Sequence, residues 1–400
     1  MELLGFAGRT VTADAVVQGL AWATAAVAGL PTAMLALECL AGTRKRASKE
    51  VGEVPPFIII MPAHDEAAGI EAAIRAAHAQ LRSNDELLVV ADNCSDDTAA
   101  RARGLGATVI ERHDAERRGK GHALEYGRAF IAAHRPDVRA VLVFDADCRA
   151  LPGSLPTLAA KAARCDAAVQ GIFLLAASPD AGPVVRISGF AFLIKNLVRQ
   201  QGLARLSGAA LLHGSGMAFP RTMFLAMRWR GGSLVEDLEM GLDLLLAGQR
   251  VVVAPDARIL SASSSIEGTG GQRRRWEHGM MQTAWRYVPR LLARAVRRPS
   301  LTLVACDLMV PPTVLLALCS FAALCVVLAL AGPSGPFLAL MAVQVAAAVG
   351  VARAWWRCGR EILPPSSLRD LPAYVAWKLP LIVQFITDRQ REWTRTERLP

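Results

Sequence analysis

Long stretches without charge are the first feature of the hydrophobic and polar pattern. No charged residue occurs from Ala15 to Leu37, a run of 23 positions, which is enough for a helix to cross a hydrocarbon layer of roughly 30 Å. The basic run "GTRKRASKE" follows directly. A signal peptide carries its positive charge before the apolar part, so this order predicts a membrane helix instead. The positive-inside rule then places the basic run in the cytoplasm and the N-terminus outside.

A second uncharged stretch covers residues 308–352, which is too long for one crossing. The turn sequence "GPSGP" interrupts it at 332–336 and predicts a helical hairpin, out over about 306–331 and back over about 337–354. Near the end of the chain, residues 379–386 are apolar but too few for a span. They predict an interfacial or re-entrant helix.

The polar part of the chain, residues 52–265, alternates between two periodicities. The β-rich runs are "PFIIIM", "ELLVVA", "ATVIE" and "RAVLVFDAD". Helical segments come between them, and Ser95 is the expected N-cap of "SDDTAARARGLG". This alternation predicts an α/β domain with a parallel sheet covered by helices and with ligands at the carboxyl ends of the strands.

Composition supports a membrane setting. The chain has 53% hydrophobic residues and a net charge of +10, and its basic residues cluster beside the apolar segments. Anionic lipid is therefore a better expected partner than nucleic acid, because no basic block interleaved with stacking aromatics occurs away from those segments and only three tyrosines are available. The eight cysteines form no CxxC pair, which argues against a zinc site or a disulfide framework.

Polar residues follow the predicted strands where this architecture would bind a ligand. These residues are Pro62, His64 and Glu66 in "MPAHDE", Asp92 in "ADNCSDD", Lys120 in "RRGKGHA", and Asp145 and Asp147 in "FDADC". Carboxylate oxygens suit Mg²⁺ or Mn²⁺, ions that usually complete their coordination with substrate phosphates. Singly, each motif also fits a turn or a helix cap; their order on successive strand ends favours a common site.

Two further motifs follow. "HGSGMAF" contains Gly214 and Ser215, where the glycines allow the backbone to approach a ligand closely. "LVEDLEMGLDLLLAG" begins a helix with Glu236, Asp237 and Glu239. Acids in a first turn are ordinary helix caps, yet three exceed what capping needs, and a crowded carboxylate is a natural general base.

The basic sequence "QRRRW" precedes an amphipathic run. Its Gln272, Arg275 and Trp276 share one side of a helix, which predicts a role in the site. Arg273 and Arg274 lie off that side and are expected to contact solvent or lipid headgroups. The run over 276–298 is expected to lie on the membrane surface.

In this order, "PAHDE", "ADNCSDD", "GKGHAL", "DAD", "ED" and "QRRRW" resemble glycosyltransferase family 2, specifically the membrane-embedded branch similar to cellulose, chitin and hyaluronan synthases. The resemblance covers about residues 55–300 and implies a nucleotide-diphospho-sugar transferase (GT-A) fold with membrane helices on both sides. One departure is Val235, where the family usually has threonine before the Glu-Asp pair. This departure affects the expected local hydrogen bonding. It hardly affects the assignment of the base, because the Glu-Asp pair itself is present.

The resemblance also implies a role for each matching residue. Asp237 would be the catalytic base beside Glu236, and Asp147 would hold Mg²⁺ or Mn²⁺. The nucleotide-sugar, expected to be a UDP-sugar, would contact Pro62, His64, Glu66, Asp92, Lys120 and Asp145. The diphosphate and the acceptor would contact Gly214, Ser215, Gln272, Arg275 and Trp276.

Together the pattern and the resemblance predict a multi-pass protein of the inner (plasma) membrane with a cytoplasmic catalytic domain. The expected parts are an extracytoplasmic N-terminus (1–14), a transmembrane helix (15–39), a basic cytoplasmic linker (40–51), the GT-A domain (52–270), the QxxRW motif with an interfacial helix (271–300), a transmembrane hairpin (301–356) and a cytoplasmic or interfacial C-terminal region (357–400).

The expected reaction is an inverting transfer of one sugar to a lipid, or of many to a growing polysaccharide with export or assembly subunits as partners. Only three crossings are predicted, few for a polymer channel, and this favours a glycolipid product or a polymerase that needs partners. A different class, a non-catalytic nucleotide-binding scaffold of an envelope-assembly complex, would be expected to lose Asp147 or Asp237. Both residues are present.

Overall fold

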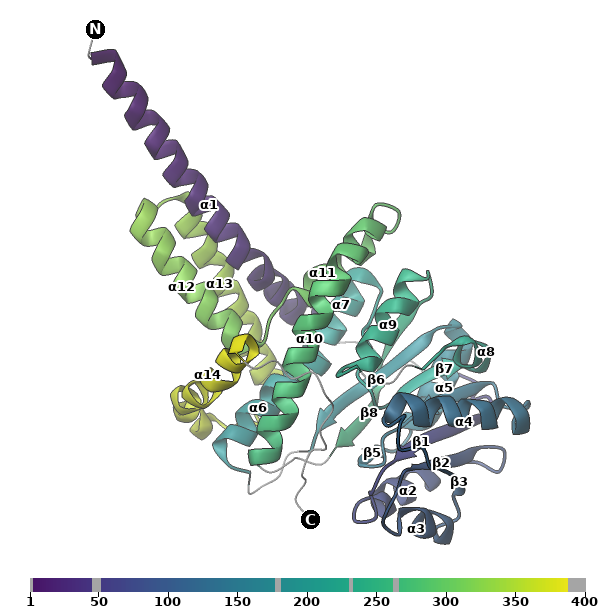
Figure 1. The fold of residues 1–400 in the computed structure, drawn as a ribbon. Helices are drawn as coiled ribbons and strands as arrows, with labels where there is room; N and C mark the ends of the chain where they lie inside the picture. Colours follow the sequence, from purple (N-terminus) through teal and green to yellow (C-terminus); the bar gives the residue numbers. More distant parts are fainter. Residues whose placement is uncertain (1–2, 45–51, 177–180, 230–232, 262–265, 388–400) are drawn as a thin grey trace.

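The computed structural model describes residues 3–44, 52–176, 181–229, 233–261 and 266–387. The predicted basic linker and C-terminal region therefore lie partly outside the described residues. In the described part, an α/β domain carries a group of long helices on one side (Figure 1).

One mixed sheet of eight strands forms the centre of the domain, in the order β3-β2-β1-β4-β7-β6-β8-β5. The strands are β1 (Phe57–Ala63), β2 (Glu86–Asp92), β3 (Thr108–Arg112), β4 (Ala140–Val143), β5 (Cys148–Ala150), β6 (Ala168–Leu175), β7 (Met217–Pro220) and β8 (Val251–Ser261). The expectation of a parallel sheet is correct for β1 to β4. In the other half it is correct for β6 and β8, which are parallel, and wrong for β7, which is antiparallel to β4 and β6, and for β5, which is antiparallel to β8. β7 begins at the carboxyl end of β4, opposite Val143, and therefore runs back along it. A parallel neighbour would need a crossover that returns the chain to the other end of the sheet.

Helices cover both faces of the sheet. Around the first half lie α2 (Ile70–His78), α3 (Thr98–Gly104), α4 (Lys120–His134) and α5 (Ser154–Cys165); around the second half lie α8 (Arg221–Ala226) and α9 (Glu236–Leu246). A continuous helical stretch is formed by α6 (Pro183–Leu193), the π-helical segment η1 (Ile194–Arg199) and α7 (Gln200–Ser207). Ser95 does not cap α3, because its backbone N–H and its hydroxyl both donate to the Asp65 carboxylate, so the helix begins after Asp97.

Alternate residues of the central strands point into two cores. Ile58 and Ile60 of β1 pack toward α4 and α9, and Phe57, Ile59 and Met61 pack toward α2 and α5. All five side chains are fully buried, which is why these strands read as continuous apolar runs. The cores fix the strand ends that carry the polar motifs.

The remaining helices are α1 (Leu3–Gly42), α10 (Ile266–Ala295), α11 (Ser300–Leu308), α12 (Thr313–Ala331), α13 (Gly335–Ala354), the π-helical segment η2 (Trp355–Gly359), the 3₁₀ segment η3 (Pro365–Asp370) and α14 (Leu371–Thr387). Among the described residues, three helical stretches are long and apolar enough to cross a membrane: Asp14–Gly42, Thr313–Ala331 and Gly335–Gly359. α1 packs along both α12 and α13 (Figure 1). The second stretch begins at Thr313 and not near 306, because Pro311 and Pro312 separate it from α11. That these three stretches cross a bilayer stays a prediction.

The last turns of α1 dock onto the α/β domain. A Cβ on Gly42 would lie 2.0 Å from the Val198 carbonyl oxygen, and one on Gly202 would lie 2.2 Å from the Glu38 carbonyl oxygen. Beside this contact, the buried Arg199 pairs with Glu38 at 2.8 Å and with Asp307 at 2.6 Å. One guanidinium therefore joins α1, η1 and α11.

Candidate active site

Five predicted residues converge beyond the carboxyl end of β4. Lys120, the first residue of α4, pairs with Asp145 through its ammonium group and donates a hydrogen bond of 2.7 Å to the Gly214 carbonyl oxygen. Gly214 has a φ of 92°, and a Cβ there would lie 3.0 Å from an Asp237 carboxylate oxygen. Only glycine suits this backbone conformation and this approach. We call Lys120, Asp145, Gly214, Glu236 and Asp237 the lysine–acid cluster.

Burial sets the proton affinities in this cluster. It raises the pKa of Glu236 to about 7, with Lys120 opposing the rise and Asp237 adding to it. Burial likewise raises the pKa of Asp237 above its usual value, against the attraction of Lys120. For Lys120, burial acts to lower the pKa, but Asp145 outweighs it and the net pKa is raised. Burial also raises the pKa of Asp145, against the attraction of Lys120, so the cluster holds one firmly charged ammonium and three carboxylates with a raised affinity for a proton.

Asp147 lies beside the cluster and completes an oxygen donor set. Oxygen and sulfur atoms of Asp145, Asp147 and Cys148 lie within 4.8 Å of one another. The two aspartates fit a hard cation such as Mg²⁺ or Mn²⁺. Burial raises the pKa of the Cys148 thiol well above its usual value, and this thiol donates to the Asp147 carboxylate at 3.4 Å. Ser261, which the sequence analysis missed, donates to Asp147 at 3.1 Å and orients its carboxylate.

The loop with Gly214 is held by a residue that the sequence analysis also missed. Gln170 in β6 donates to the Ser215 carbonyl oxygen at 2.9 Å and accepts the His213 backbone N–H at 2.8 Å. The Ser215 hydroxyl in turn accepts the Asp145 backbone N–H at 3.1 Å. A fully buried amide within the apolar strand "AVQGIFLL" was the available signal.

A second group of predicted residues gathers at the ends of β1 and β2. The His64 ring Nδ1 lies 2.8 Å from the Asp92 carbonyl oxygen, and the Asp92 carboxylate pairs with Arg112 at 2.6 Å. Pro62 stands opposite Val90 in the sheet, and the Glu66 backbone N–H donates to Thr98. Arg112 is a further residue that the sequence analysis missed; it ends β3 and holds the Asp92 carboxylate in place.

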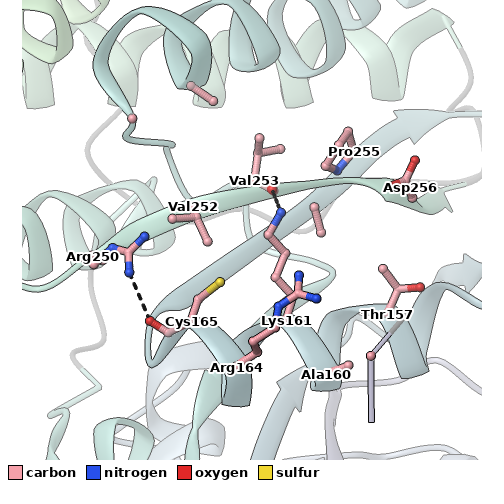
Figure 2. Close-up of a pocket in the computed structure, with 14 residues that line it drawn as sticks. Thr157, Ala160, Lys161, Arg164, Cys165, Arg250, Val252, Val253, Pro255 and Asp256 are labelled. Atoms are coloured by element: carbon pink, nitrogen blue, oxygen red, sulfur yellow. Dashed lines mark hydrogen bonds between the residues drawn. The ribbon is translucent and has the colours of Figure 1, made fainter. Parts of the chain in front are cut away.

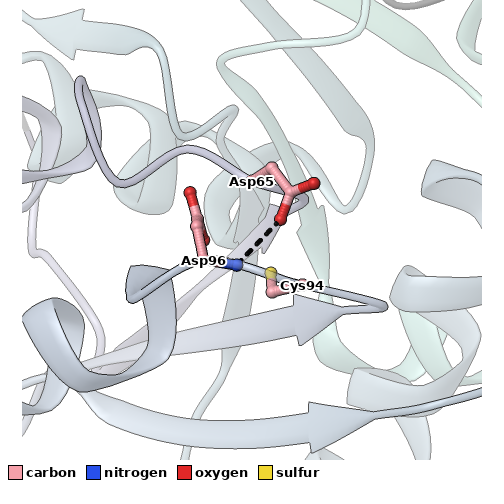
Figure 3. Close-up of side chains that lie close together, drawn as sticks. All are labelled: Asp65, Cys94 and Asp96. Atoms are coloured by element: carbon pink, nitrogen blue, oxygen red, sulfur yellow. Dashed lines mark hydrogen bonds between the residues drawn. The ribbon is translucent and has the colours of Figure 1, made fainter.

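Asp65, Cys94 and Asp96 form another cluster of candidate ligands next to this group (Figure 3). Its carboxylates already accept hydrogen bonds from the loop: Asp65 from the Ser95 N–H at 2.7 Å, and Asp96 from the Ala67 N–H at 3.1 Å. The pKa of Asp65 is lowered, since these hydrogen bonds outweigh the effect of burial, which alone would raise it. This cluster ties together the two loops after β1 and β2.

The "QRRRW" motif lies in α10, where Trp276 packs on Phe192 with ring centroids 5.3 Å apart. Gln272 and Arg275 are half-buried on the same helix. The expectation for Arg273 is wrong: it is buried, donates to the Ser188 hydroxyl at 2.7 Å and lies over the Phe192 and Trp276 rings. The three-residue spacing of Arg273 and Trp276 puts them on one helix face, which is the signal that was overlooked.

α10 continues from this motif along α9. A Cβ on Gly279 would lie 2.9 Å from Val235, and Arg286 pairs with Glu239. On its other side, α14 covers the motif, since its buried Lys378 pairs with Glu277. The apolar residues 379–386 belong to this docked helix. α10 thus links the "QRRRW" motif to the helix that begins with Glu236 and Asp237.

A pocket of about 290 Å³ lies elsewhere, between α5 and β8 (Figure 2). Lys161, Arg164 and Arg250 contribute to its wall. Lys161 donates to the Val253 carbonyl oxygen at 2.6 Å and Arg250 to that of Cys165 at 3.3 Å. None of the predicted site residues lines it, so it is separate from the lysine–acid cluster.

Comparisons with known proteins bear on this arrangement. The family model described as "Glycosyltransferase like family 2" matches residues 55–279. No curated protein matches the chain. Among solved structures, a mannosyltransferase of Pyrobaculum calidifontis in complex with GDP-Man and Mn²⁺ is similar over 94% of this chain and 100% of its own, at 19% identity and a TM-score of 0.56. Glucosyl-3-phosphoglycerate synthase of Mycobacterium tuberculosis, in complex with Mn²⁺, UDP and phosphoglyceric acid, matches over 60% of this chain and 84% of its own, at 20% identity and a TM-score of 0.41.

Proposed function

The chain belongs to glycosyltransferase family 2 and has the GT-A fold, and we propose that it is a membrane-bound inverting enzyme that transfers a sugar from a nucleotide-sugar to a lipid or polysaccharide acceptor. The observation that carries the proposal is the lysine–acid cluster, in which Lys120 joins Asp145 to the Gly214 loop beside Asp237. A nucleotide-sugar needs a cation for its diphosphate, and its acceptor needs a base. This cluster offers both within one site.

On the donor side, Asp92 and His64 would receive the nucleoside, and Asp145 the ribose or sugar. The similar mannosyltransferase was solved with GDP-Man and Mn²⁺, whereas the motifs led us to expect a UDP-sugar. Asp147, with Asp145 beside it, would hold Mg²⁺ or Mn²⁺, because two carboxylates form its donor set. When bound, the ion supplies positive charge to the leaving diphosphate.

On the acceptor side, Asp237 would remove the proton from the attacking hydroxyl. The new bond joins that oxygen to the anomeric carbon, the bond to the diphosphate oxygen breaks on the opposite face, and the nucleoside diphosphate leaves. One displacement inverts the configuration at the anomeric carbon. Lys120 and Arg275 would oppose the negative charge that builds up on the leaving group. Gln272 and Trp276 would position the acceptor.

A groove of about 490 Å³ supports a lipid acceptor over a polymer. Its walls are α1, α12 and the segment that joins α11 to α12. Most of its lining residues are apolar, such as Val27, Pro31 and Leu316. Two of the membrane-length helices form its walls. We therefore propose that the enzyme acts at the cytoplasmic face of the plasma membrane, with a lipid chain in this groove.

The test uses the full-length protein in nanodiscs with Mn²⁺ or Mg²⁺. Radiolabelled UDP-, GDP- and dTDP-sugars are supplied with bacterial lipid extract, and the product is sized. We expect a lipid that carries one sugar, formed from one class of donor. If long chains form, the product is a polymer and the lipid acceptor is refuted. If no donor supports any transfer, the whole proposal is refuted.

The metal proposal has its own control. Chelation should abolish transfer, and Asp147→Asn should raise the Mn²⁺ concentration needed for half-maximal activity at least tenfold. Asp65→Asn changes a carboxylate in the other acidic cluster and should leave that concentration unchanged. Full activity in excess chelator would refute the metal site.

A further inference from the structure

An amine on the π-helical segment η1 is not used by the proposed mechanism. Lys195 is half-buried between Ile194 and Asn196, which are both buried. Insertions of this π-helical kind within α-helices occur frequently at functional sites. Lys195 interacts electrostatically with Asp237, the proposed base. It therefore belongs to the surroundings of the reaction, although no motif pointed to it.

The other cation of this segment differs from Lys195 in its partners. Arg199 is compensated by two carboxylates, Glu38 of α1 and Asp307 of α11. Among the described residues, no hydrogen-bond acceptor or carboxylate lies within bonding distance of the Lys195 ammonium group. A half-buried ammonium without a hydrogen-bond partner in the protein is available to a ligand, and an unpaired polar group in a functional region is commonly completed by one.

A second polar group without a partner lies close by. The Nδ1 atom of His213 is buried and has no hydrogen-bond partner in the described part of the chain. Burial, and then the charges of Lys195 and Arg199, hold the pKa of His213 well below its usual value, so its ring is neutral and one ring nitrogen can donate. His213 directly precedes Gly214, whose carbonyl oxygen accepts from Lys120. Lys195 interacts electrostatically with both His213 and Asp237, so the two open groups belong to the surroundings of the proposed base.

We propose that Lys195 and His213 form a subsite for an anionic phosphate group of the acceptor, next to Asp237. The inference rests on the proposed function and narrows its acceptor to a phosphate-linked lipid. Arg199 connects this subsite to Asp307, and Met309 and Pro311, just beyond, line the apolar groove between α1 and α12. A lipid chain in that groove would bring its phosphate toward η1.

The chemistry of the subsite favours phosphate over a neutral headgroup. An ammonium gives a charge-assisted hydrogen bond, which is shorter and stronger than a neutral one. A neutral hydroxyl would leave the Lys195 charge uncompensated, whereas a phosphate oxygen would offset it. A phosphate bound here lies near the attacking hydroxyl if the two groups belong to one acceptor molecule.

Binding measurements test this without turnover. Full-length protein in phosphatidylcholine nanodiscs, with chelator and no donor, is titrated with farnesyl phosphate, farnesol and inorganic phosphate. We expect farnesyl phosphate to bind at least tenfold more tightly than either other probe, because it alone offers both the chain and the charge. Equal binding of farnesol would overturn the anionic subsite. Equal binding of inorganic phosphate would overturn its assignment to a lipid.

Variants separate recognition from folding. Lys195→Met should weaken farnesyl phosphate about ten- to hundredfold and leave farnesol and nucleoside diphosphate unchanged, while Lys195→Arg should keep most of the affinity. His213→Gln should have a smaller effect in the same direction. Lys161→Met, at the separate pocket, is the matched control and should change none of these affinities. Weakened nucleoside diphosphate binding in Lys195→Met would move this residue to the donor side and overturn the proposal.

A pH titration adds a readout that a structural role would not give. The pKa of Lys195 is lowered to about 8, first by burial and then by Arg199; Asp237 and Asp307 oppose this and Arg273 adds to it. Affinity for farnesyl phosphate should therefore fall as the pH rises through about 8, and Lys195→Arg should remove this dependence. Failure of the proposed function would look different, since donor turnover would be absent while these binding results stood.

Discussion

The two halves of the catalytic domain treat charge differently. In the half formed by β1 to β4, the predicted site acids Asp92 and Asp145 each have a cationic partner from a neighbouring strand or helix: Asp92 has Arg112, and Asp145 has Lys120. In the half formed by β6, β7 and the α6–η1–α7 helix, Lys195 and the His213 Nδ1 atom have no such partner among the described residues. The first half is pre-organised and the second is left open. This is what we expect of an enzyme whose donor is common to a family and whose acceptor is particular.

The largest expected effect separates the base from its surroundings. Asp237→Asn should lower the rate of transfer about 10³-fold, because a positioned general base typically contributes 10²- to 10⁴-fold. The measurement is initial rate at saturating donor, together with nucleoside diphosphate affinity, which should not change. Asp243→Asn is the matched control, since Asp243 lies on the same helix and its bond to the Tyr287 hydroxyl survives the change. Wild-type turnover by Asp237→Asn would remove the assigned base.

A second prediction concerns the joint between the acceptor half and α1. Arg199→Met leaves Glu38 and Asp307 buried without their cation and should destabilise the protein by about 3–5 kcal/mol. Thermal unfolding in detergent measures this effect. Adding Glu38→Leu and Asp307→Leu should recover most of the loss, because apolar replacement of a whole buried ion cluster is often neutral. An unchanged melting temperature in Arg199→Met would mean that the ion cluster does not hold α1 in place.

The pH dependence of transfer should report Glu236. Its pKa is raised to about 7, so it is neutral below that pH and becomes charged as the pH rises. A charged Glu236 increases the basicity of the adjacent Asp237, and transfer should therefore rise a fewfold from pH 6 to 8. Glu236→Gln should flatten this rise. If the rise persists unchanged in that variant, a different group controls it.

The smallest effect is expected at the outer face of α10. Trp285 is 87% exposed and faces away from the core, so Trp285→Ser should leave the melting temperature in detergent nearly unchanged. In nanodiscs, transfer should fall about twofold if this face rests on lipid. Tyr126→Ser changes an exposed aromatic on α4 and serves as the control. Equal activity of Trp285→Ser in both media would argue against lipid contact.

Much of the donor half could be predicted because its signals are local. β1 and β2 are apolar runs that end at polar motifs, and α4 begins at the glycine-flanked Lys120, as the sequence suggested. The acceptor half depends on contacts distant in sequence. Gln170 acts on a loop more than forty residues later, and Arg273 reaches back to Ser188. No periodicity carries such pairings, so the antiparallel β7 and the burial of Arg273 were not foreseen.

Lys195 illustrates the same limit more sharply. It stands in "FLIKNLVRQ", where one lysine among apolar residues looks like an ordinary surface position of a helix. Its nearness to Arg199 follows from their spacing on one helix, but only the fold brings it toward Asp237. A residue of this kind is identified by the partners it lacks, which a sequence cannot display.

The glycine contacts between α1 and the α6–η1–α7 helix have a geometric consequence. Gly42 and Gly202 leave no room for even a methyl group at the joint, so the backbone of α1 is in direct contact with that of η1 and α7. In a bilayer, a joint of this kind would keep Asp237 at a set height above the lipid surface. The acceptor hydroxyl must reach that height on its own headgroup. The joint would then select acceptors by headgroup length, because a shorter headgroup would not bring its hydroxyl to Asp237.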